Sequence, residues 1–316
     1  MQSEAVTPVH PRELILELSH NCNLSCQMCG FVKERNQPGY LMTEQTLAQV
    51  LDAFEVPPEV VRLNGRGEST FHPQFPQFSR IIRSRWPEAS LHLFTNLNIR
   101  DEDRVLLLKE HRIQLFISMD SPEPEELARI RKGANWNLMQ RNFNLLRDMN
   151  PRPFLVFTLQ ADNLHQIKAM AQFAQNQKIG LIYNVVRSDQ PDYRLQNRLI
   201  GEWQGVRTEF QEAFQLMQAS GLSCLMPDQI QGIEMELGQA RRTNGRRGSC
   251  PALERETCVQ YDGQVTPCNM FHPQVFGHIR QGRIGHILSS PAAQDFRETH
   301  KNHPYCANCA WLGDAA

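Results

Sequence analysis

The sequence predicts a mixed α/β fold, a partial (β/α)6 barrel of the TIM type followed by a small cysteine-rich region with a β-hairpin and a helix. Short apolar runs alternate with longer amphipathic segments from residue 13 to about residue 226. The apolar runs are rich in Ile, Val, Leu and Phe, as buried parallel strands are. The composition changes near residue 227, so we expect domains at residues 1–226 and 227–316.

Six strands are expected, each followed by at least one helix. The expected strands cover residues 14–18, 60–63, 91–95, 113–118, 154–159 and 179–186, and a further short strand covers 222–226. The expected helices cover residues 43–54, 74–85, 102–111, 137–149, 165–177, 199–219 and 291–300. Active sites of such barrels lie at the C-terminal ends of the strands, so functional side chains should directly follow the strands.

Charge and hydropathy exclude some classes of partner. The 316 residues include 33 basic and 34 acidic ones, which gives no electrostatic case for nucleic acid or an anionic membrane surface. The N-terminus has no basic start followed by an apolar core, and no run reaches the 18 apolar residues of a membrane span. We therefore expect a soluble, cytoplasmic protein with no nucleic acid and no membrane as partner.

Three cysteines, Cys22, Cys26 and Cys29, follow the first expected strand with the spacing C-x3-C-x2-C. Three thiolates on one loop suit three irons of a [4Fe-4S] cluster and leave the fourth iron open, as a catalytic metal site requires. Spacing restricts the metal without fixing it. Zinc with a distant fourth ligand, and thiols that bind no metal, therefore remain alternatives.

The other cysteines gather near the C-terminus. The chain has nine cysteines and no signal peptide, which favours metal ligands over a disulfide framework. Asp262-Gly263 predicts a hairpin with a two-residue turn, which returns Cys268 towards Cys250. Cys306 and Cys309 supply a second pair, so two metal centres are expected. A zinc ribbon has a similar arrangement and remains an alternative for the C-terminal centre.

The cysteine loop, together with Gly65-Arg66-Gly67-Glu68 after the second strand, resembles the radical S-adenosylmethionine (radical SAM) family. The resemblance implies that the open iron chelates the amino and carboxylate groups of SAM. It also implies reductive cleavage of SAM to a 5′-deoxyadenosyl radical that removes hydrogen from a substrate carbon. Glu68, with Gly65 and Gly67, would hold the SAM amino group, although the family usually has Gly at the position of Arg66 and Pro at that of Ser69.

The same resemblance implies further SAM contacts. Met28 stands where the family usually has an aromatic residue near adenine, and a thioether fills the same apolar role. Asn96 and Ser118 follow the third and fourth strands and resemble positions near the ribose and carboxylate. Arg131 resembles an arginine that pairs with the SAM carboxylate, a contact that suits a planar bidentate donor.

The C-terminal cysteines resemble those of the twitch domain, a short form of the SPASM extension of radical SAM enzymes. The resemblance implies that Cys250, Cys268, Cys306 and Cys309 hold an auxiliary [4Fe-4S] cluster. It also implies a reducing electron donor such as flavodoxin or ferredoxin.

We therefore expect a radical SAM enzyme that oxidises or epimerises a hydroxyl-bearing small molecule or sugar. Cys224, at the end of a short strand, is a candidate hydrogen donor for epimerisation, whereas Cys224 and Cys258 are alternatively small buried apolar side chains. A peptide maturase is an alternative, although such enzymes often carry a leader-binding domain and only about 12 residues precede the first strand here. A non-catalytic zinc-binding scaffold is a third.

Overall fold

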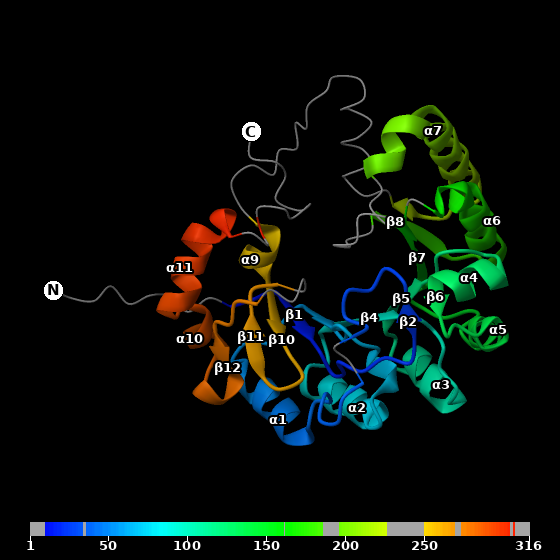
Figure 1. Ribbon diagram of the computed structural model, residues 1–316. Coiled ribbons are helices and arrows are strands. Elements are labelled where there is room, and N and C mark those ends of the chain that lie inside the picture. The colour runs from blue at the N-terminus through cyan, green and yellow to red at the C-terminus, as the bar shows by residue number, and fades with distance from the viewer. Residues whose placement is uncertain are drawn as a thin grey trace. The chain divides into compact units, whose positions relative to one another are not determined.

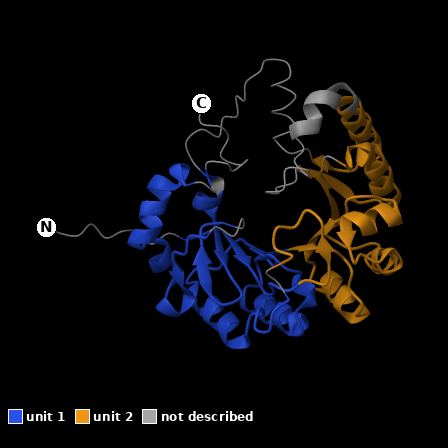
Figure 2. Cartoon of the chain, viewed as in Figure 1, with its two compact units in different colours: residues 1–21, 36–92, 235–316 blue, residues 22–35, 93–234 orange. Residues whose placement is uncertain are grey.

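A computed structural model of the chain describes residues 10–33, 36–160, 162–185, 196–225, 250–268, 273–303 and 306. Figure 1 shows its helices and strands. The chain divides into two compact units (Figure 2). Unit 1 contains residues 1–21, 36–92 and 235–316, and unit 2 contains residues 22–35 and 93–234.

Unit 1 combines the first strands of the chain with the C-terminal cysteine region. Its strands are β1 (Glu13–Leu16), β3 (Val60–Arg62), the first half of β4 (Ser90–Thr95), β10 (Glu256–Val259), β11 (Gln264–Thr266) and β12 (Gly277–His278). Its helices are α1 (Glu44–Ala53), α2 (Phe75–Arg85), α9 (Pro251–Arg255), α10 (Ile284–Leu288) and α11 (Pro291–Thr299), with 3-10 turns at Ser69–Phe71, Ile279–Gln281 and His300–Asn302. The strand order is β12-β11-β10-β1-β3-β4.

β1 lies between a strand of the barrel and a strand of the C-terminal region. Ile15 pairs in parallel with Arg62 of β3 on one side and with Cys258 of β10 on the other. Leu14, Ile15 and Leu16 are fully buried, so both faces of β1 are covered, as expected for a parallel strand. The C-terminal region thus completes the core of unit 1. The boundary predicted between residues 226 and 227 falls outside the described residues and stays a prediction.

The predicted C-terminal hairpin is confirmed, but its loop is longer than expected. β10 and β11 pair antiparallel, and the amide of Gln260 donates to the carbonyl of Gln264 at 2.9 Å. Three residues, 261–263, therefore make the loop, instead of the two that Asp262-Gly263 predicts. Gly263 has φ of +94°, the positive value that the last residue of a three-residue hairpin loop requires.

Unit 2 contains the cysteine loop and the second half of the barrel strands. Its strands are β2 (Ser25–Cys26), the second half of β4, β5 (Gln114–Ser118), β6 (Arg131–Lys132), β7 (Phe154–Leu159), β8 (Gly180–Val185) and β9 (Cys224–Leu225). Its helices are α3 (Glu102–Glu110), α4 (Pro124–Ile130), α5 (Trp136–Leu145), α6 (Ile167–Gln177) and α7 (Gln196–Ala219), with a 3-10 turn at Leu164–Gln166. The strands β5-β7-β8-β9 run parallel in that order.

The two faces of the unit 2 sheet carry different side chains. Helices α6 and α7 cover one face of the sheet (Figure 1). On this face the hydroxyl of Tyr183 donates to the carbonyl of Ile167 in α6 at 2.8 Å, and its ring packs on Phe210 of α7. On the opposite face, Phe94 stacks on Phe116 with ring centroids 4.5 Å apart, and Phe116 stacks in turn on Phe154. Strand alternation therefore separates a helix-facing layer from an aromatic row.

The expected fold class is confirmed as a mixed α/β structure with a large, mostly parallel sheet. Thr43 caps α1 as its position predicts, since its hydroxyl accepts from the amide of Thr46 at 3.0 Å. The helix α4 was not expected, because its seven residues show no extended apolar period. Within the described residues, no helix has the length and hydropathy that a membrane span needs.

Replacing Gly263 by alanine is expected to destabilise unit 1 by about 2–4 kcal/mol. An L side chain costs free energy at this φ, and its Cβ would also lie 2.8 Å from the His278 ring. Gly221 is the matched control, because it has φ of +64° with nothing within 4 Å of an added Cβ. Gly221→Ala should cost only about 1 kcal/mol in denaturant unfolding, and equal losses for the two variants would contradict the contact with His278.

Candidate functional site

The three cysteines of the predicted cluster lie on one braced loop of unit 2. Strands β2 and β6 pair antiparallel and bring Cys26 opposite Arg131. The amide of Cys29 donates to the carbonyl of Cys26 at 3.1 Å, which closes the turn between these two ligands. Cys26 is buried, whereas Cys22 and Cys29 are partly exposed. The loop thus has two accessible thiols beside one that the protein encloses.

Nitrogen donors point at two of these sulfurs. The Nδ2 of Asn96 lies 3.8 Å from the Sγ of Cys22, and the amide of Leu24 lies 3.5 Å from it. The Nη1 of Arg131 lies 3.9 Å from the Sγ of Cys26. Such donors stabilise thiolates and raise the reduction potential of a cluster that the thiolates bind. The residues present therefore fit an anionic iron–sulfur cluster.

Arg131 is held by a buried carboxylate. Its Nε lies 2.7 Å from the Oδ2 of Asp120, whose Oδ1 accepts from the amide of Thr158 at 2.8 Å. Burial on its own lowers the pKa of Arg131, but the charges of Asp120 and Cys26 outweigh burial and raise the pKa above its ordinary value. The guanidinium thus stays charged beside Cys26. Its predicted pairing with the SAM carboxylate stays a prediction.

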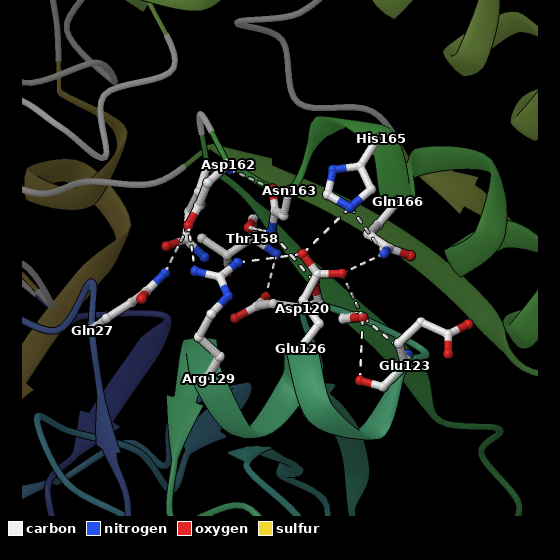
Figure 3. A network of polar contacts seen from close by, with 12 residues as sticks. Gln27, Asp120, Glu123, Glu126, Arg129, Thr158, Asp162, Asn163, His165 and Gln166 are labelled. Atoms are coloured by element: carbon white, nitrogen blue, oxygen red, sulfur yellow. Dashed lines mark hydrogen bonds and ion pairs between the residues drawn. The ribbon is translucent and has the colours of Figure 1, made fainter.

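A second polar network joins the cysteine loop to α4 and to the segment before α6 (Figure 3). Gln27, between two cysteines, donates to the Oδ2 of Asp162 at 3.2 Å, and Arg129 donates to the same atom at 2.8 Å. Arg129 also pairs with Glu126, which accepts from Gln166. Sequence reasoning missed this network, because its members lie far apart in the chain and each resembles a surface residue.

The predicted SAM loop after β3 lies in unit 1, packed on the residues that precede Cys22. A Cβ on Gly67 would lie 2.3 Å from the carbonyl oxygen of Asn21, and the amide of Glu68 donates to that oxygen at 2.9 Å. A Cβ on Gly65 would lie 2.2 Å from the side chain of Glu17. Both glycines are therefore required by close approach to the chain's own atoms.

Glu68 is almost fully buried, and its carboxylate is oriented. The Oε1 atom accepts from the amide of Thr70 at 3.2 Å and from the Thr70 hydroxyl at 2.7 Å. These bonds hold one oxygen of the carboxylate in place, as suits an acceptor for an ammonium group. Its contact with the SAM amino group stays a prediction.

The other residues expected at the SAM site also stay predictions in that role. Asn96 has the clearest placement, since its Nδ2 also donates to Asn23 at 2.9 Å and its Oδ1 accepts from the amide of Asn98 at 2.8 Å. Ser118 ends β5 and lies on the face opposite the helices, in register with Val156. Met28 is partly exposed on the cysteine loop.

Three of the four predicted auxiliary ligands are described, and all three are partly exposed. Cys250 caps α9, Cys268 follows β11, and Cys306 follows the last 3-10 turn. Cys309 lies outside the described residues. Among the residues that the structure describes, no three His, Cys, Asp or Glu side chains converge as ligands of a single ion. An iron–sulfur cubane does not need such convergence, because each thiolate binds its own iron.

Of the two remaining cysteines, one faces the helices and the other is fully buried. Cys224 pairs in register with Leu181, so it lies on the same face of the sheet as Tyr183, towards the helices. Burial raises the pKa of Cys224 to about 11 and also raises the pKa of the fully buried Cys258. This placement supports the alternative that both are small apolar side chains, and the hydrogen-donor role of Cys224 stays an untested prediction.

The cysteine loop carries nitrogen donors near two of its sulfurs and belongs to an α/β fold. These features are typical of an iron–sulfur protein. The chain belongs to the radical SAM superfamily, whose family profile matches residues 16–174. A second profile, the iron–sulfur cluster-binding domain SPASM, matches residues 250–310. The radical SAM match implies SAM and a [4Fe-4S] cluster, and the SPASM match implies an auxiliary iron–sulfur cluster. These are the cofactors that the sequence predicts.

Characterised relatives are distant in sequence. The chain is 24% identical to a tungsten-containing aldehyde ferredoxin oxidoreductase cofactor-modifying protein of Pyrococcus furiosus, over 96% of this chain and 88% of the relative. It is 27% identical to a GTP 3′,8-cyclase of Hydrogenovibrio crunogenus, over 51% of this chain and 50% of the relative.

Solved structures of similar fold cover nearly the whole chain. For anSMEcpe with bound AdoMet the TM-score is 0.71 at 16% identity, with 95% of this chain and 87% of that chain covered. For Streptococcus suis SuiB bound to the precursor peptide SuiA the TM-score is 0.73 at 14% identity, with 96% and 70% covered. At these identities the likeness shows the fold alone.

Asp120→Asn is expected to lower the free energy of unfolding by about 3–5 kcal/mol, because it leaves Arg131 buried without a counter-charge. It should also lower the iron retained by the first cysteine set. Glu59→Gln is the matched control, since it breaks the Arg12–Glu59 pair, whose side chains are 56% and 61% exposed. That variant should unfold like the parent in denaturant, and similar losses in both would contradict the special role of Asp120.

Cys224 is expected to react slowly with iodoacetamide in the folded protein. With a pKa of about 11, about one such thiol in a thousand is ionised at pH 8, and the rate should rise about tenfold for each added pH unit. Mass spectrometry of the labelled protein measures the rate. Denatured protein is the control, and equal rates at pH 8 in the two states would contradict the placement of Cys224.

Proposed function

We propose that this radical SAM enzyme dehydrogenates a hydroxyl-bearing small molecule or sugar. The observation that carries the proposal is the cysteine loop whose Cys22 and Cys26 sulfurs accept from Asn96 and Arg131. Dehydrogenation is favoured over epimerisation because both spare thiols are badly placed for hydrogen donation. Cys224 faces the helical layer and Cys258 is fully buried.

When bound, the clusters and SAM would supply radical removal of hydrogen from a substrate carbon and an acceptor for the remaining electron. The chain's own residues prepare this chemistry. Cys22, Cys26 and Cys29 would hold the first cluster, and Arg131 with its Asp120 partner keeps a positive charge beside Cys26. Glu68 offers an oriented carboxylate to the SAM ammonium.

The auxiliary ligands belong to the same proposal. Cys250, Cys268, Cys306 and Cys309 are the cysteines of the SPASM match that would hold the second cluster, since Cys258 is enclosed between Ile15 and Thr266. Net oxidation leaves an electron on the substrate, and a second cluster can accept that electron. A redox-neutral rearrangement needs no such acceptor. A flavodoxin or ferredoxin is proposed as the source of the first electron.

A peptide substrate is the second candidate. A structure of anSMEcpe with bound AdoMet and Cp18Cys peptide matches this fold with a TM-score of 0.69 at 18% identity. Release of 5′-deoxyadenosine from SAM can be measured without any substrate. This measurement tests the radical chemistry before sugars and peptides are compared as substrates.

Anaerobically reconstituted protein is expected to bind about eight irons, four for each cluster. It should release 5′-deoxyadenosine from SAM under a strong reductant. Replacing Cys22, Cys26 and Cys29 together by alanine should abolish 5′-deoxyadenosine and leave about four irons, because only the auxiliary set remains. Iron and sulfide analysis with chromatography of the nucleoside provides the measurement.

Cys224→Ala is the matched control for cysteine loss and should keep the parent's iron content. It also separates the two reactions, since dehydrogenation survives this change and epimerisation through Cys224 does not. Zinc without iron, together with no SAM cleavage, would refute the radical SAM proposal and leave the zinc scaffold.

A further inference from the structure

Glu17 occupies an unusual position one residue beyond β1, where its carboxylate is fully buried. Arg66 of the predicted SAM loop donates three hydrogen bonds to this carboxylate. Its backbone amide donates to Oε1 at 2.9 Å, its Nε to Oε1 at 3.2 Å, and its Nη2 to Oε2 at 3.2 Å. One carboxylate thus fixes both the backbone and the side chain of the loop at residue 66.

These bonds keep Glu17 ionised. Burial on its own raises the pKa of Glu17, but hydrogen bonds from His20 and Arg66 and the charge of Arg66 outweigh burial and lower the pKa to about 2. A buried carboxylate without its cation costs several kcal/mol of stability, so the ion pair holds the loop beside Glu17. The close approach of Glu17 to Gly65 has the same cause, since the carboxylate must lie across the loop to reach Arg66.

The same arginine reaches the C-terminal region. The Nη2 of Arg66 lies 2.6 Å from the Oε1 of Gln260, although the two residues are 194 positions apart in sequence. Gln260 stands at the base of the β10–β11 hairpin, where its amide donates to Gln264 and its carbonyl accepts from Gly263, each at 2.9 Å. The acceptor is thus attached to a rigid turn and is 8% exposed.

A second contact joins the same parts. The amide of Tyr261 donates to the Oε2 of Glu17 at 3.5 Å, and the Tyr261 ring lies 5.7 Å from the His20 ring. His20 in turn lies 3.4 Å from the Oε1 of Glu17. The end of β1, the loop after β3 and the hairpin of the iron–sulfur region therefore meet around one carboxylate, within unit 1.

We propose that Gln260, Arg66 and Glu17 form a clamp through which the C-terminal hairpin positions the SAM-binding loop. The proposal rests on the proposed function, since it assigns the loop at residues 65–68 to SAM. Arg66 and Gln260 are positioning residues, and SAM affinity depends on a hairpin of the auxiliary domain. A glycine at position 66, usual in the family, offers no side chain for this link, so the clamp is a property of this chain.

The clamp is tested by equilibrium binding of SAM to reconstituted protein, anaerobically and without reductant, so that no turnover occurs. Gln260→Met keeps the side-chain volume and removes the acceptor. It should weaken SAM binding at least about fivefold with unchanged iron content. Gln264→Ala is the matched control, because its side chain bonds to Asp262 in the same hairpin.

Hydrogen exchange without SAM provides an independent readout. The amides of Arg66 and Glu68 donate to Glu17 and Asn21 and should exchange slowly in the parent and at least about fivefold faster in Gln260→Met. Arg66→Lys is a second variant that keeps the charge beside Glu17 and loses the planar fork, and it should behave like Gln260→Met.

Parent affinity and parent exchange in both variants would overturn the clamp while leaving the proposed function intact. Absence of SAM binding by the parent itself would instead sink the proposed function. The exchange result would then still decide whether the hairpin positions the loop.

Discussion

Each unit contains a fully buried carboxylate that one arginine neutralises, and within its own unit each pair holds a segment that is predicted to contact SAM. Glu17 is bound by Arg66 in unit 1, and Asp120 is bound by Arg131 in unit 2. A buried charge without a partner costs several kcal/mol, so each pair fixes the segment that carries its arginine. In both cases the segment is one to which the resemblance assigns a SAM contact. Electrostatics in the core thereby determines the geometry of the functional loops.

The arginines differ in what else they do. Arg131 turns its Nη1 towards Cys26, so its charge acts on a predicted cluster ligand. Arg66 turns towards Gln260, so its charge acts on another part of the fold. One pair therefore lies beside a predicted metal ligand and the other holds a loop, although both use the same pair of functional groups.

The sequence predicts the barrel elements because the determinants are local. Apolar runs predict the buried strands, and the Thr43 cap predicts the start of α1. The spacing of Cys22, Cys26 and Cys29 predicts the cluster loop, because a tight loop brings its own residues together.

Partners distant in sequence cannot be predicted in this way. Nothing near Arg66 indicates Gln260, and nothing near Gln27 indicates Asp162, since tertiary packing alone brings these pairs together. The glycines at positions 65 and 67 indicate a close approach, but only the structure identifies Glu17 and Asn21 as the groups approached. The face on which Cys224 lies depends on strand register, which a two-residue strand does not reveal.

The parallel pairing of β1 with β10 has a consequence for biosynthesis. Ile15 is made long before its partner Cys258, which lies in the C-terminal cysteine region. Until then one edge of the central strand offers unpaired amides and carbonyls to any other nascent chain. Such long-range pairing is slow to form and leaves intermediates prone to aggregation. A chaperone that shields this edge until β10 has been made would therefore reduce such aggregation.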